Sequence, residues 1–233
     1  MKKNNVILIG TSVMLEKCIE ISVKNFKKVY VISKDRNIKK KFKKKIQIIN
    51  LNEIKNINSD YFFSILNKKI LPLRCLKYIK KFSLNFHDGP LPKYAGLFSS
   101  TWSIVNNEKV HGVCWHKIEK FVDAGDILIE RKFNIKKDDT AYDIDTKGIL
   151  IGINLFKKII KKIKTGKYKF KKQNLKKRTY FGKSDLKKLI NKFKNLHNNP
   201  TIIRSLTLSR QKSNIIYRLF KIKLKTSNKI LKF

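Results

Sequence analysis

Cysteine, acidic residues and arginine are all scarce in this 233-residue sequence. The cysteines are Cys18, Cys75 and Cys114, with no C-x-x-C pair and no histidine beside them at the spacing of a zinc ligand. An odd, scattered set argues against a disulfide framework and against a zinc site. The amphipathic stretches that contain the three cysteines predict buried, neutral thiols.

Long hydrophobic runs are also missing. The stretch 149–156 is interrupted by Gly152 and Asn154, and it falls short of the ~20 apolar residues that a membrane-spanning helix needs. The apolar run at 6–10 is too short for the hydrophobic region of a secretory signal. These features predict a cytoplasmic protein without a membrane span.

Acidic residues number 16 against 56 lysines and arginines, which gives a formal net charge of +40. A basic surface attracts polyanions such as RNA without sequence preference. Only seven of the basic residues are arginines, whereas dedicated nucleic-acid-binding proteins favour arginine for its planar, two-pronged hydrogen bonding. Lysine spread along the whole chain beside isoleucine and asparagine is more typical of drift in an AT-rich genome. We therefore expect RNA contact through the general charge only.

Hydrophobic residues make up 42% of the sequence and include 15 phenylalanines, enough for a buried core. In the first part of the chain, apolar runs of strand length alternate with helical patterns. The predicted strands are 6–9, 29–32, 46–49, 61–66 and 83–86, and the predicted helices include 13–23 and 73–80. This alternation predicts an α/β fold with an open, mostly parallel twisted sheet and helices on both faces. Gly10 ends the first strand, but the absence of a G-x-G-x-x-G fingerprint argues against a nicotinamide cofactor.

Further elements are predicted beyond the fifth strand. They are a helix at 99–105 capped by Ser99, Ser100 and Thr101, strands at 112–116 and 126–130 paired antiparallel around a loop, a Lys-rich helix at 184–196, a turn at 198–200, and a hairpin or frayed tail at 215–233. Thr140 and Asp143 have the spacing of a capping box, which predicts the start of a long helix. The predicted core stripe of that helix is Leu150, Ile153, Phe156, Ile160 and Ile163.

A candidate site follows the fifth predicted strand. Asn85 and His87 are two residues apart on an extended segment, so both side chains leave the same face, and the Gly89-Pro90 pair then ends the strand. Open α/β sheets place their chemistry at such carboxyl ends. Asp123, in a glycine-containing turn, is the nearest carboxylate to orient the imidazole, and Asp126 is its rival.

These residue types favour acyl transfer. An amide can donate a hydrogen bond to an oxyanion, an imidazole can move a proton, and a carboxylate can fix the tautomer of the imidazole. Nothing in this chemistry requires a metal. The sequence therefore predicts a catalytic group of Asn85, His87 and Asp123, whereas His116 is interpreted as a strand histidine beside the site.

Taken in order, the motifs resemble those of formyltransferases that use 10-formyltetrahydrofolate. They are N-x-H-x-x-x-L-P at 85–92, Y-x-G at 94–96, G-V-x-x-H at 112–116 and V-D-x-G-D-I at 122–127. The resemblance covers about residues 5 to 183 and implies a Rossmann-like catalytic domain over 1–183, followed by a short Lys-rich extension over 184–233. It also implies a folate cosubstrate, no metal, and catalytic roles for Asn85, His87 and Asp123. It implies folate contacts at Leu66, Ile70 and Leu71 in the family's pterin-binding loop, and a further folate contact at Val122.

The sequence around the candidate histidine also bears on the acceptor. The run H-D-G-P-L-P at 87–92, the pair Trp115-His116 and the run 178–182 are similar to the formylation domains of nonribosomal peptide and polyketide synthases. That similarity implies an amino group on a carrier protein as acceptor, and a basic surface would help to meet an acidic carrier. The alternatives are a methionyl-tRNA formyltransferase with a trimmed tail and an inactive basic binding module of the same fold.

Overall fold

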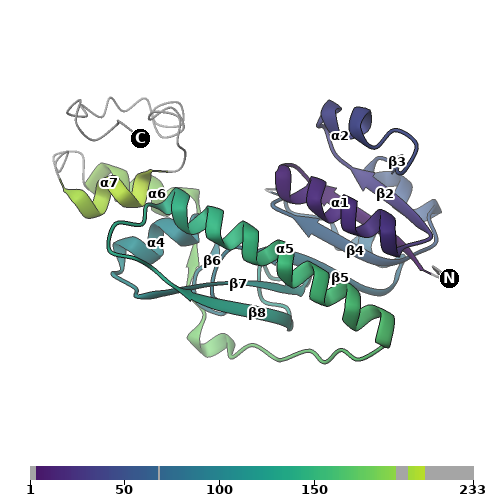
Figure 1. Cartoon of the computed structure of the whole chain (residues 1–233). Coiled ribbons are helices and arrows are strands. Elements are labelled where there is room, and N and C mark those ends of the chain that lie inside the picture. The colour runs from purple at the N-terminus through teal and green to yellow at the C-terminus, as the bar shows by residue number, and fades with distance from the viewer. Residues whose placement is uncertain (1–3, 68, 193–198, 208–233) are drawn as a thin grey trace. The chain divides into compact units, whose positions relative to one another are not determined.

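The computed structural model describes residues 4–67, 69–192 and 199–207 (Figure 1). The chain forms two compact units. The first unit consists of Met1–His87, Val113–Arg131 and Ile149–Gln173, and the second unit consists of Asp88–Gly112, Lys132–Gly148 and Asn174–Phe233. None of the described helices combines the length and the hydrophobicity of a membrane span. The cytoplasmic location stays a prediction.

A seven-stranded sheet has the order β3-β2-β1-β4-β5-β7-β8. Its strands are β1 Asn5–Gly10, β2 Lys28–Ile32, β3 Gln47–Ile48, β4 Ser59–Ile65, β5 Ile79–His87, β7 Val110–Lys117 and β8 Ile127–Asn134. The pairs among β1 to β5 are parallel, and β5 pairs with β7 antiparallel. This confirms the predicted open, mostly parallel α/β sheet.

Both faces of the sheet are covered. The helical elements of this part are α1 Val13–Asn25, α2 Arg36–Lys41, the 3-10 helix η1 Leu51–Asn56, α3 Leu73–Leu76 and α5 Ala141–Thr165. On one face, Phe63 of β4 packs edge-on against Phe156 of α5, with ring centroids 4.9 Å apart. On the opposite face, Ile7 and Phe62 share a core cluster with residues of η1 and α3. Alternate residues of each strand thus fill two separate apolar layers.

Gly10 is required by a close backbone approach. It has a φ of 153°, and a Cβ atom at this position would lie 2.0 Å from the carbonyl oxygen of Ile65 at the end of β4. Only glycine allows the ends of β1 and β4 to meet at this distance. The glycine therefore serves the turn between β1 and α1.

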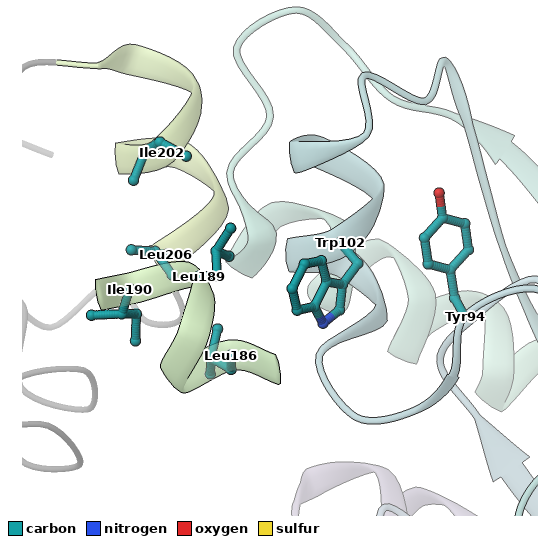
Figure 2. Packing of buried hydrophobic residues seen from close by; sticks show 7 residues of the cluster. All are labelled: Tyr94, Trp102, Leu186, Leu189, Ile190, Ile202 and Leu206. Atoms are coloured by element: carbon teal, nitrogen blue, oxygen red, sulfur yellow. The ribbon is translucent and has the colours of Figure 1, made fainter. Parts of the chain in front are cut away.

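The second unit contains its own core (Figure 2). Its elements include β6 Ala95–Gly96 paired with β9 Tyr180–Phe181, the short 3-10 helix η2 Leu175–Lys177, and the helices α4 Ser99–Val105, α6 Lys183–Lys192 and α7 Pro200–Leu206. Trp102 of α4 stacks on Phe181 with ring centroids 4.3 Å apart, and Leu189 and Leu206 are buried in the same cluster. The described residues of α6 and α7 thus pack in the same unit as α4. The division into a domain over 1–183 and an extension over 184–233 stays a prediction.

Several sequence predictions are corrected by the structure. The helix expected at 73–80 ends at Leu76, because Ile79 already pairs with Ser59 of β4. The turn expected at 198–200 is in part the start of α7, where the side chain of Asn199 accepts hydrogen bonds from the backbone of Thr201 and Ile202. The end of the helix expected at 184–196 and the hairpin or tail expected at 215–233 lie outside the described residues.

Two further predictions, the core stripe of α5 and the cap of α4, also differ from the structure. Thr140 and Asp143 do form the capping box of α5, but Leu150 is 59% exposed. At 3.6 residues per turn Leu150 lies about 120° around the helix from the buried Phe156. Ser99, Ser100 and Thr101 do not cap α4, since its N-cap is Phe98 with a φ of 61°. All three polar side chains are buried instead.

Candidate active site

The alternation of β5 determines where its polar side chains lie. Leu84 and Phe86 are buried, and the ring of Phe86 lies against the position of Gly152 on α5. Since successive side chains of a strand point to opposite faces, Asn85 and His87 lie on the face away from α5. Two apolar neighbours thereby fix the face on which the polar pair lies.

Strand β7 adds a second histidine to this face. In the antiparallel register, Asn85 lies opposite His116 and His87 lies opposite Cys114. Directly opposed residues on an antiparallel pair have neighbouring side chains. The rings of His87 and His116 are accordingly close, with centroids 6.2 Å apart.

The loop after β7 presents Asp123 from a left-handed backbone position, with a φ of 54°. The side-chain amide of Gln173 donates hydrogen bonds to the backbone carbonyls of Asp123 (3.0 Å) and Gly125 (2.6 Å). Gly125 is needed because a Cβ atom there would lie 2.1 Å from the carbonyl oxygen of Lys117. These contacts offset the cost of the unusual conformation and hold the carboxylate in place.

The four side chains form a compact polar group. Asp123 Oδ2 lies 3.4 Å from His87 Nδ1, and Asp123 Oδ1 lies 3.3 Å from His116 Nε2. The Asn85 Nδ2 atom lies 3.2 Å from His116 Nε2 and 3.5 Å from Asp123 Oδ1. The two imidazoles and the carboxylate are each at most 9% exposed. One carboxylate therefore lies between two imidazoles at the end of β5.

The structure brings together the three residues predicted for the catalytic group. Asp126 is not among them, since its carboxylate faces the ammonium group of Lys117 at 3.8 Å. The sequence predicts His116 only as a strand histidine beside the group, whereas in the structure it contacts both Asn85 and Asp123. Its position on the same strand face as Cys114 was readable from sequence, but its partner on β5 depends on a register that sequence does not show.

The geometry defines what each group can do. A carboxylate only accepts hydrogen bonds, so a neutral His87 that donates from Nδ1 to Asp123 has its basic lone pair on Nε2. The Asn85 amide carries N–H donors beside that ring. This gives a hydrogen-bond donor for an oxyanion and a proton acceptor on one strand face.

The residues predicted to contact folate lie in two loops. The strand order reverses between β1 and β4, and the carboxyl ends at such a switch point are where open α/β sheets bind ligands. Leu66 directly follows β4 with a φ of 49°. Ile70 is 83% exposed, while Leu71 packs against the core cluster under β1 and Val122 is partly buried. Their role in folate binding stays a prediction.

A separate polar cluster in the second unit was missed by sequence analysis. The backbone carbonyl of Asp88 accepts hydrogen bonds from Ser99 Oγ at 2.6 Å and from His111 Nε2 at 2.7 Å. A carbonyl cannot donate, so Nε2 of His111 carries the proton. The other ring nitrogen, Nδ1, then accepts a hydrogen bond from Ser103 Oγ at 2.8 Å.

Asp145 of α5 lies in the same part of the second unit. Burial and, to a smaller extent, the negative charge of Asp88 raise the pKa of Asp145 to about 7, against a hydrogen bond from Ser100 that lowers it. Among the described residues, its buried Oδ1 atom has no hydrogen-bond partner. No group of three His, Cys, Asp or Glu side chains in the described ranges has an arrangement that could hold a metal ion.

The chain is similar in sequence to known formyltransferases. The formyl transferase family matches residues 5–158. Methionyl-tRNA formyltransferase of Caldanaerobacter subterraneus subsp. tengcongensis is 33% identical over 130 residues, 56% of this chain and 42% of that protein. GDP-perosamine N-formyltransferase of Brucella melitensis biotype 1 is 31% identical over 111 residues, 48% of this chain and 43% of that protein. The matched part thus spans less than half the length of these curated relatives.

A solved structure agrees over more of the chain. The N-formyltransferase of Helicobacter canadensis in complex with folinic acid and dTDP-3-aminofucose superposes with a TM-score of 0.72 and 28% identity, over 88% of this chain and 80% of that one. The family match includes all four side chains of the polar group. The chain belongs to the formyl transferase family.

Proposed function

We propose that the protein transfers a formyl group from 10-formyltetrahydrofolate to a primary amine. The proposal rests on the group of Asn85, His87 and Asp123, in which the Asp123 carboxylate lies 3.4 Å from His87 and 3.5 Å from the Asn85 amide. Family membership supports the reaction class. The folate contacts are assigned to Leu66, Ile70, Leu71 and Val122.

The proposed reaction has two steps. The amine nitrogen attacks the formyl carbon, a C–N bond forms, and the carbonyl oxygen becomes an oxyanion. The oxyanion then collapses, the bond from the formyl carbon to the folate nitrogen breaks, and that nitrogen leaves with a proton. Asn85 stabilises the oxyanion by donating an N–H, an effect that typically amounts to about 10²–10³ in rate.

His87 moves the proton between the two nitrogens. With Nδ1 directed to Asp123, its Nε2 takes a proton from the attacking amine and returns it to the leaving nitrogen. Asp123 favours the charged imidazolium that forms between these steps, because opposite charges at this distance attract. No covalent enzyme intermediate is needed.

The acceptor amine is proposed to be borne by a negatively charged molecule, which the net charge of +40 would attract. The first candidate is an aminoacyl group on an acidic carrier protein, from the motif at 87–92. A nucleotide-linked amino sugar is the second, because the Helicobacter canadensis structure contains dTDP-3-aminofucose. Charged initiator tRNA is the third, from the relative in Caldanaerobacter subterraneus.

The test is an acceptor panel. Purified protein is incubated with 10-formyltetrahydrofolate and, separately, aminoacyl carrier protein, dTDP-amino sugars, charged initiator tRNA and simple amines, and release of tetrahydrofolate is followed. Release that depends on one acceptor and is lost in the His87→Ala variant supports the proposal and names the acceptor. Folate binding without release on any acceptor would replace it with a binding module of the same fold.

A further inference from the structure

His116 forms a triangle of close polar contacts with two members of the catalytic group. The Asn85 Nδ2, His116 Nε2 and Asp123 Oδ1 atoms are separated by 3.2, 3.3 and 3.5 Å. His116 is only 2% exposed, so water does not compete freely for its ring nitrogens. The hydrogen positions in this triangle can be derived from the partners.

The second nitrogen of His116 determines its tautomer. His116 Nδ1 lies 2.7 Å from the backbone carbonyl oxygen of Lys117. A carbonyl oxygen only accepts, so Nδ1 carries a hydrogen. A neutral imidazole has one ring hydrogen, which leaves Nε2 as an acceptor that faces both Asn85 and, at 3.3 Å, the Asp123 oxygen. An Asn85 N–H directed between these two acceptors offsets their repulsion.

This acceptor sets the orientation of the Asn85 amide. The NH₂ end can donate to His116 Nε2 and also faces the Asp123 carboxylate. If the amide were turned over, its oxygen would face two acceptors, and the repulsion would disfavour that state. The three atoms form a nearly equilateral triangle, whereas the two N–H bonds of an amide diverge by about 120°. One N–H therefore faces both acceptors, and the other is directed away from them, toward a developing oxyanion.

We propose that His116 is a positioning residue for formyl transfer, which in its neutral Nδ1–H form directs an Asn85 N–H to the reacting carbonyl. This inference rests on the proposed function. In this inference His116 affects the reaction by orienting Asn85, and not by acting on His87 or on the folate. A protonated His116 would donate to Asp123 instead and would present no acceptor to Asn85.

The first test compares two amide substitutions. His116→Gln places an amide near the position of Nε2 and can still accept from Asn85, whereas the shorter His116→Asn reaches only the Lys117 carbonyl. We expect His116→Asn to lower kcat by about 10- to 100-fold, with KM for the folate within about two-fold, and His116→Gln to recover most of the loss. Equal loss in both variants would overturn the inference. Thermal midpoints and folate affinity check that both variants fold.

The second test is a double-mutant cycle. If His116 acts through Asn85, then His116→Asn has little further effect, less than about three-fold, in an Asn85→Ala background. A purely structural role would give the same loss in both backgrounds. Additive losses would therefore exclude the positioning role.

A third measurement does not depend on turnover. Long-range ¹H–¹⁵N NMR of histidine-labelled protein, with His116 assigned by its substitution, reports the tautomer directly. We expect the Nδ1–H form, with Nε2 unprotonated. An Nε2–H or doubly protonated ring overturns the inference, while failure of every acceptor in the panel would instead overturn the proposed function.

Discussion

The two units each bury a polar cluster, and the two clusters differ in how completely their members are satisfied. In the first unit, each oxygen of the Asp123 carboxylate faces a hydrogen-bond donor, His87 Nδ1 at Oδ2 and the Asn85 amide at Oδ1. In the second unit, Asp145 has a buried oxygen without a hydrogen-bond partner in the described part of the chain and lies near the charge of Asp88. Similar residue types therefore produce different electrostatics.

The pKa of a buried acid depends on the groups that face its carboxylate. Asp123 faces two hydrogen-bond donors, His87 Nδ1 and the Asn85 amide, which offset the cost of burying its charge. Asp145 has a hydroxyl donor, Ser100, and a like charge, Asp88, so desolvation prevails and the pKa rises to about 7. We expect the first cluster to control turnover and the second to control the pH dependence of stability.

The largest expected effect is on turnover at His87. His87→Ala removes the only strand side chain assigned to proton transfer, and we expect kcat to fall by about 10²–10⁴ in the tetrahydrofolate-release assay. The thermal midpoint should change little, which shows that the variant still folds. Full activity of this variant would contradict the site assignment, and the first cluster could then no longer be said to control turnover.

The two aspartates of the loop supply a matched pair. Asp123→Asn keeps the size of the side chain but removes the charge that favours the His87 imidazolium, so we expect kcat to fall by about 10- to 1,000-fold. Asp126→Asn loses only a half-exposed contact with Lys117 at 3.8 Å and should stay within about two-fold. A larger loss in Asp126→Asn would transfer the carboxylate role to the rival residue.

A smaller effect, on stability, is expected at Asp145. Its pKa is about 7 in the folded protein and has the ordinary value of 3.8 when exposed, so between these values the folded state binds more protons. Stability contributed by this group is therefore present below about pH 4 and is lost as the pH rises through 7. Asp145→Asn removes this dependence, and we expect it to be more stable than the parent by about 1–3 kcal/mol at pH 8.

Denaturant unfolding of both proteins at pH 4.5 and pH 8 measures this effect. The difference between variant and parent should grow with pH, because only the parent acquires the buried charge. A difference that is the same at both pH values would mean that Asp145 ionises normally. The second cluster would then not control the pH dependence of stability.

The smallest expected effect is at Ser100, whose hydrogen bond lowers the pKa of Asp145. Ser100→Ala removes this donor, so the pKa of Asp145 should rise further, and the loss of stability with pH should extend to a higher pH and become larger. The expected size is about 1 kcal/mol at pH 8, measured by the same unfolding experiment. The Asp145→Asn background provides the control, because there the substitution should no longer shift the pH profile.

Strands and helix caps were predictable from the sequence, because the residues that determine them lie close together in the chain. The apolar runs at 6–9, 29–32 and 61–66 predicted β1, β2 and β4 because fully buried parallel strands need apolar residues on both faces. The helix at 99–105 and the capping box of Thr140 and Asp143 were also predictable, since their signals lie within a few residues. The helix α7 was missed because the turn signals at 198–200 concealed its N-cap.

At the site, the local sequence is enough to place Asn85 and His87 on one face of a strand, because side-chain direction alternates along any extended chain. That His116 contacts this pair, and that Asp126 does not, depends on tertiary contacts. The register of β5 on β7 and the Gln173 contacts with the loop join residues far apart in the chain. Such contacts depend on how two distant segments pack, and no local pattern of residues encodes that packing.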